Sequence, residues 1–102
     1  MFVVTNTIKV KQGTGAKLAE RFSEGEGVSE MPGFVRMEVW HGVNKDQEEI
    51  KVSTLWDNEE AFRGWTQSES FRKAHQGRGK NEDILGASLD QYELLAHITA
   101  ED

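Results

Sequence analysis

The strongest constraint on the fold is an alternation of side chains near the start of the sequence. From Phe2 to Val10 every second residue is apolar, with Asn6 as the one exception. A period of two is typical of a β-strand that buries one of its faces. The segment 2–10 is therefore predicted to be a strand whose apolar face packs against the core.

Asn6 breaks this pattern on the face that is expected to be buried. Asparagine is depleted in strands, and a buried amide that lacks a hydrogen-bond partner costs about 1–3 kcal/mol. Two interpretations stay open from the residue alone. Asn6 either ties down a neighbouring loop or keeps its amide ready for a ligand.

The rest of the chain shows the patterns of three more strands with helices between them. The elements predicted after the first strand are a helix at 16–24, strands at 34–42 and 49–56, a helix capped by Asp57, a short helix capped by Ser68, and a strand at 88–99. Asp57 and Glu60 have the spacing of a capping box. The order strand, helix, strand, strand, helix, strand predicts an α+β fold, namely a ferredoxin-like βαββαβ domain.

Helices are expected to cover one face of this sheet. The other face is expected to carry Leu55, Leu89 and Leu95 among small and polar residues. A partly apolar sheet face needs a second layer to cover it. A second copy of the sheet would provide that layer, so a homodimer that forms a dimeric α+β barrel is predicted.

Length and composition narrow the possible functions. A chain of 102 residues predicts one domain over residues 1–102. The net charge is −6 and no stripe of Lys and Arg is present, which argues against nucleic acid as a partner. The absence of cysteine excludes thiolate chemistry and iron–sulfur clusters. No leader-like segment or membrane-length apolar run is legible, so a cytoplasmic protein with no membrane partner is predicted.

Several charged and aromatic residues have more than one interpretation. The acidic clusters, residues 46–49 among them, are interpreted as solvated turns and helix caps. Trp65 fits either a core or a pocket position. His75 fits either a half-buried surface histidine or an axial iron ligand that binds through a neutral imidazole. Arg78 and Lys80 follow it, and two cations there could meet the two propionates of a haem. His41 and His97 are interpreted as surface residues.

Taken together, these residues resemble a known family. Nearly end to end, the chain resembles the IsdG-type haem-degrading monooxygenases, small dimeric barrel proteins of the antibiotic-biosynthesis-monooxygenase-like superfamily. The matching positions are Asn6, residues 20–22 (Glu-Arg-Phe), 31–34 (Met-Pro-Gly-Phe) and 54–56 (Thr-Leu-Trp), Ala61-Phe62-x-x-Trp65 and Phe71-x-x-Ala74-His75. The barrel fold is shared with many unrelated functions, whereas the Asn, Trp and His positions are far more specific.

The resemblance implies a role for each matching residue. His75 would be the proximal iron ligand. Asn6 would donate a hydrogen bond to the ligand on the distal side of the iron. Trp65 would press the porphyrin out of plane, and Phe22 would form part of the pocket wall.

The resemblance also implies an activity, a haem oxygenase that opens the porphyrin ring with O2 and releases iron. Haem, as iron protoporphyrin IX, would be both substrate and cofactor. No flavin or nicotinamide motif is legible, so the electrons would come from an external reductase or a small reductant. Three alternatives stay open: a cofactor-independent quinol or polyphenol monooxygenase of the same fold, a non-enzymatic haem-binding protein, and a small interaction domain without a pocket.

Overall fold

The computed structural model describes residues 1–23, 27–75 and 84–100, without the side chains of residues 22–23 and 73–75. The strands are β1 (Phe2–Val10), β2 (Phe34–Asn44), β3 (Gln47–Trp56) and β4 (Ile84–Glu93). The helices are α1 (Gly15–Ser23), α2 (Glu59–Thr66) and α3 (Glu69–His75), with a short 3-10 turn, η1 (Val28–Glu30). The predicted order of strands and helices is confirmed.

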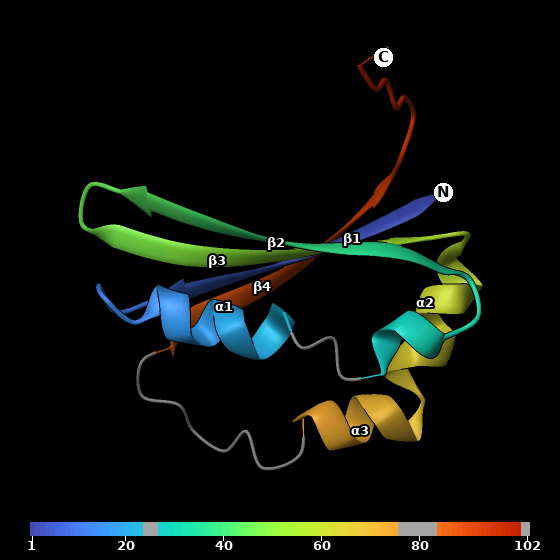
Figure 1. The fold of residues 1–102 in the computed structure, drawn as a ribbon, viewed down its shortest axis with the longest axis horizontal. Coiled ribbons are helices and arrows are strands. Elements are labelled where there is room, and N and C mark those ends of the chain that lie inside the picture. Colours follow the sequence, from blue (N-terminus) through green and yellow to red (C-terminus); the bar gives the residue numbers. More distant parts are fainter. Residues whose placement is uncertain (24–26, 76–83, 101–102) are drawn as a thin grey trace.

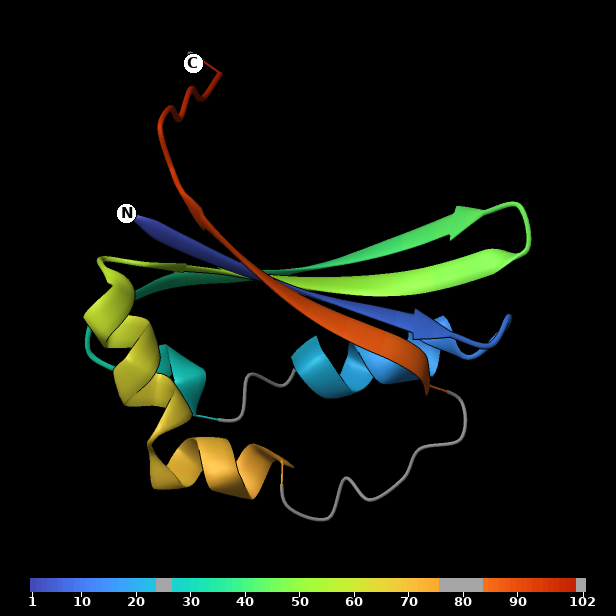
Figure 2. The same ribbon diagram turned by 180° about the vertical axis from the view of Figure 1, so that it is seen from behind.

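The strands form one antiparallel sheet in the order β2-β3-β1-β4. The described helices lie on one side of this sheet, and the chain that follows β4 leaves on the other side (Figure 1, Figure 2). α1 packs on β2 and β3, and α2 packs on β3. This is the predicted ferredoxin-like α+β topology. In the described ranges no helix is both long and apolar enough to cross a membrane.

The core between the sheet and the helices is divided into two clusters. The first cluster lies under α1 and contains Ile8, Val10, Leu18, Ile50 and Val52. The second lies near η1 and α2 and contains Val4, Val28 and Trp56. Trp56 is fully buried, and its Nε1 donates a hydrogen bond to Thr54 Oγ1 at 2.9 Å. The even-numbered residues of β1 and β3 supply most of both clusters, so the predicted alternation of the two strands is confirmed.

The turn before β2 needs a glycine because it passes close to α2. Gly33 has a φ of 82°, and a Cβ there would lie 2.5 Å from the Cβ of Ala61. The backbone N–H of Asp57 donates to the Gly33 carbonyl at 2.8 Å, which holds Asp57 at the end of the sheet. The cap of α2 is therefore one residue later than predicted. Asn58 Oδ1, not Asp57, accepts from Ala61 N at 2.9 Å.

The last strand differs most from its prediction. β4 covers Ile84–Glu93 instead of 88–99. It pairs along β1, and Glu93 lies opposite Phe2, the first residue of that strand. Among the described residues 94–100, one further backbone hydrogen bond follows, from Leu94 N to the Met1 carbonyl at 2.9 Å. Residues 94–99 alternate as a strand would, but they extend past the end of β1 and so do not pair with it as a strand.

The predicted orientation of Leu89 is also wrong. Leu89 lies opposite Asn6 in the β1–β4 pair, and residues directly opposite each other in antiparallel strands share a face. Leu89 is therefore on the helix side of the sheet. Leu55 lies opposite Val3, on the open face as predicted, and Leu95 follows the end of β4.

Candidate functional site

Asn6 lies in the break between the two core clusters. Val4 belongs to one cluster and Ile8 to the other, with Asn6 between them on β1. The Asn6 side chain is half-buried and takes part in none of the hydrogen bonds found among the described residues. The described chain thus offers no loop for this amide to tie down. That favours the alternative interpretation, in which the amide is available to a ligand.

Trp65 joins the second core cluster to the junction of α2 and α3. It is half-buried and packs at the edge of that cluster. Its ring meets the ring of Phe71 edge to face, with the centroids 5.5 Å apart and the planes at 90°. Ser68 Oγ donates to the Trp65 carbonyl at 2.7 Å and accepts from Phe71 N at 3.1 Å. Ser68 therefore caps α3 as predicted, and the two short helices are fixed to each other.

The other predicted site residues lie at the limits of the described chain. His75 is the last residue of α3, and it shares a helix face with Phe71 because the two are four residues apart. Phe22 lies in the last turn of α1. The side chains of both residues, and Arg78 and Lys80 entirely, lie outside the described part of the chain. The structure places Asn6 and Trp65 on the helix side of the sheet, and the roles of Phe22, His75 and Arg78 stay predictions.

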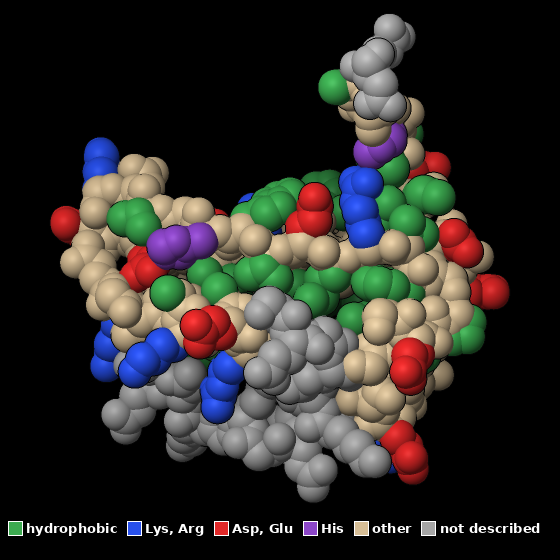
Figure 3. Space-filling view, viewed as in Figure 1, with side chains coloured by type: hydrophobic (Ala, Val, Ile, Leu, Met, Phe, Trp, Pro, Cys, Tyr) green, Lys and Arg blue, Asp and Glu red, His purple; other side chains and the backbone are tan. Residues whose placement is uncertain are grey.

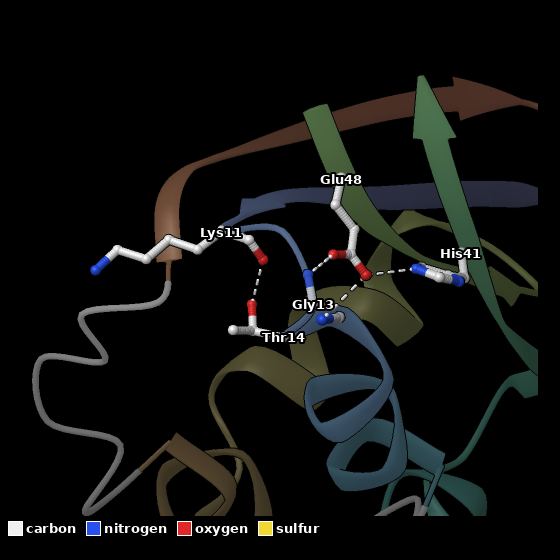
Figure 4. Close-up of polar contacts among 6 residues, drawn as sticks. Lys11, Gly13, Thr14, His41 and Glu48 are labelled. Carbon is white, nitrogen blue, oxygen red and sulfur yellow. Dashed lines mark hydrogen bonds and ion pairs between the residues drawn. The ribbon is translucent and has the colours of Figure 1, made fainter. Parts of the chain in front are cut away.

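Glu48 was expected among the solvated carboxylates, and this is wrong. Its side chain is only 7% exposed. The carboxylate accepts from Gly13 N at 2.7 Å and Gly15 N at 3.1 Å, where α1 begins, and from His41 Nε2 at 2.6 Å (Figure 4). A Cβ on Gly15 would collide with Glu48 Oε2, so this close approach requires glycine. His41, expected to be a plain surface residue, is part of this link.

The sequence did carry a signal for this buried carboxylate. Glu48 is separated from Ile50, Val52 and Trp56 by even numbers of residues, so it lies on the same, core-facing side of β3. A carboxylate at a core-facing position has to find hydrogen-bond donors. The same contacts lower the pKa of Glu48 below its ordinary value of 4.5: the hydrogen bond from His41 has the largest effect, the N–H groups of Gly13 and Gly15 add to it, and burial opposes it.

Glu48→Gln is expected to lower the free energy of unfolding at neutral pH and to flatten its dependence on acid pH. The folded-state pKa is depressed, so the stabilisation from this carboxylate is present above about pH 4.5 and is lost as the pH falls through the folded-state value. Urea unfolding followed by circular dichroism across this range measures the effect. Glu49→Gln, the neighbouring residue on the other face, is the matched control. Parallel pH profiles for wild type and Glu48→Gln would contradict the assignment.

The fold and the position of Asn6 define a class of protein. It is a small α+β domain with one half-buried amide, that of Asn6, between the two core clusters on the helix side of the sheet. Residues 1–77 match the antibiotic biosynthesis monooxygenase family. The chain belongs to this family, and the predicted resemblance is confirmed.

Three known proteins are similar to this chain over 90% or more of their own lengths. A Staphylococcus saprophyticus protein named heme oxygenase (staphylobilin-producing) is 35% identical, over 99% of this chain and 98% of its own. A Bacillus thuringiensis protein named heme-degrading monooxygenase is 41% identical, over 92% and 90%. The structure of the heme-degrader MhuD from Mycobacterium tuberculosis, solved with two hemes bound in its active site, has a TM-score of 0.76 and 30% identity, over 97% and 100%.

Proposed function

We propose that this protein is a haem-degrading monooxygenase, which opens the porphyrin ring with O2 and external electrons and releases iron. The observation that carries the proposal is the half-buried Asn6 amide, which has no partner among the described residues and lies between two core clusters. The names of relatives that are 35% and 41% identical support it. When bound, haem supplies both the iron that activates oxygen and the carbon that is oxidised.

The side chains around Asn6 suit a haem. Val52 and Leu89 flank it across the sheet, so the row is apolar apart from one amide. Pockets for flat organic ligands are lined in this way, mostly apolar with a few placed polar groups. Trp65 is a large rigid ring braced by Phe71, so it can press on a macrocycle without giving way.

Each site residue has a distinct task in this proposal. His75 would ligate the iron from the end of α3, and Arg78 would pair with a propionate. The Asn6 amide would donate a hydrogen bond that orients the reacting oxygen. Phe22 would form part of the pocket wall, and Trp65 would press against the porphyrin. Trp65 also packs against Phe71. The side chain that would bend the porphyrin would therefore also fix α3, the helix that carries His75.

We also propose that the protein acts as a homodimer in the cytoplasm, with its electrons supplied by a reductase or a small reductant. Trp40 and Tyr92 lie on the open face of the sheet, 48% and 54% exposed. Figure 3 shows apolar side chains gathered in the saddle between the β2–β3 hairpin and the C-terminal segment. A second sheet would bury them, so light scattering is expected to give twice the mass of the chain.

A haemin titration of the wild-type protein tests the function. We expect a saturable shift of the Soret band, followed in air with ascorbate by loss of the band and release of iron to a ferrous chelator. Catalase is included so that free peroxide does not bleach the haem. Resonance Raman spectra of the complex should show the out-of-plane modes of a bent ring. Failure to bind haemin would favour a quinol monooxygenase, and binding without consumption would favour a haem carrier; either result contradicts the proposal.

A further inference from the structure

We infer that Leu89 forms the floor of the pocket beside Asn6 and holds the macrocycle in place over the amide. This inference rests on the proposed haem function and extends it to a residue on β4. Leu89 lies directly opposite Asn6 on the helix side of the sheet. The Cβ atoms of such a pair are about 4.5–5.5 Å apart, so one flat ligand can contact both.

The row of side chains through Asn6 opens towards β4. Val52 on β3 is 9% exposed, Asn6 on β1 is half-buried, and Leu89 on β4 is 55% exposed. In the next row along the sheet, Ile50 on β3 is 0% and Ile8 on β1 is 4% exposed, although the β4 residue of that row, Ala87, is exposed as Leu89 is. Of these two rows, the row of Asn6 is the one in which the exposure extends from β4 to β1, so the Asn6 amide and the Leu89 side chain are accessible next to each other.

The packing of the helices accounts for this opening. α1 lies on β2 and β3, and α2 lies on β3. Among the described elements, these helices therefore cover the β2–β3 half of the sheet more closely than the β1–β4 half. β4 is the edge strand drawn nearest to the viewer in Figure 2. A ligand that enters from this edge would meet Leu89 before it reaches Asn6.

A leucine at this position can do two things that the amide cannot. Its side chain gains from burial against a flat apolar ring, by the same area-dependent effect that stabilises a core. It also keeps water from the neighbouring amide, and a hydrogen bond is stronger where water is excluded. Leu89 would thus fix the ring on the β4 side and strengthen the contact that Asn6 makes.

Leu85 provides a matched control in the same strand. It is also a leucine and is 65% exposed. The register between β1 and β4 shifts at Lys9/Val10, so Leu85 has no residue of β1 opposite it and lies away from the Asn6 row. A general loss of apolar surface would affect both leucines equally, whereas a pocket floor would involve Leu89 alone.

The first experiment measures haemin binding by the full chain and by Leu89→Ala, Leu89→Met and Leu85→Ala. We expect Leu89→Ala to bind haemin about tenfold more weakly, since it removes most of the area of a buried leucine. Leu89→Met should restore the affinity, and Leu85→Ala should bind as wild type does. The thermal midpoint of the haem-free protein should change little in all three, because both positions are exposed.

The second experiment reads the Asn6 amide directly. Zinc protoporphyrin serves as a non-reacting probe, and the Asn6 side-chain NH2 signals of nitrogen-15-labelled protein are followed by NMR. In wild type and Leu89→Met these protons should exchange slowly with water, and in Leu89→Ala they should exchange faster.

Unchanged haemin affinity and unchanged amide exchange in Leu89→Ala would overturn the inference, as would an equal loss of affinity in Leu85→Ala. Failure of the wild-type protein to bind haemin would instead overturn the proposed function. The failure of the inference about Leu89 and the failure of the proposed function can therefore be told apart.

Discussion

His75→Ala is expected to fold like wild type and to lose normal haem ligation. α3 is held by the Ser68 cap and by the contact between Trp65 and Phe71, and neither depends on the imidazole. A haem iron held by a single histidine loses its protein ligand when that ring is removed. Removing only the partner of a metal ligand already costs 10–100-fold, so the loss of turnover here should exceed about 100-fold. The Soret band and ascorbate-driven turnover measure both effects.

Two controls make this result specific. His97→Ala removes an exposed histidine beyond β4 and should behave as wild type does. Imidazole added to His75→Ala should restore a wild-type-like Soret band, because it can occupy the position of the lost ring. The wild-type affinity for haemin should also weaken between about pH 7 and pH 5, since a protonated imidazole cannot ligate iron. A wild-type Soret band and turnover in His75→Ala would refute the ligand assignment.

The first three strands could be predicted because their residues alternate and their partners are in the same chain. β1 was predicted to the residue, and β3 was predicted from the alternation that ends at Trp56. β4 could not be placed by the same rule. The alternation of its segment continues past Glu93, while its partner β1 stops at Phe2. Strand length is thus decided by the neighbouring strand, which a local pattern does not contain.

The same limit applies to the site. Asn6 was found from sequence because a polar residue in an apolar register is visible locally. Leu89 was placed on the wrong face, since its orientation follows from its pairing with Asn6 across the sheet. Glu48 has charged neighbours that obscure its core-facing position in the alternation, and two of its three donors, Gly13 N and Gly15 N, come from a turn more than thirty residues away. Contacts between distant segments therefore decide what a single residue does.

Asn6→Leu is expected to stabilise the haem-free protein and to destroy its turnover. Val4 and Ile8 flank position 6 in two separate core clusters, and a leucine there would join them. It would also remove an amide that has no partner among the described residues. Together these changes should raise the free energy of unfolding by about 1–2 kcal/mol. Loss of the donor should lower turnover by about 10²–10³-fold, as for other single hydrogen-bond donors at reacting oxygens.

Two further variants separate this explanation from a structural one. Asn6→Ala removes the donor without adding contacts, so it should lose turnover at nearly unchanged stability and still bind haemin. Thr7→Ala changes the next residue of β1, on the opposite face, and should keep its turnover. If the amide served the fold, Asn6→Leu and Asn6→Ala would both unfold about 1–3 kcal/mol more easily, as urea titrations would reveal. If Asn6→Leu instead raises the stability and lowers the turnover, the asparagine at position 6 is kept for the reaction at a cost in core packing.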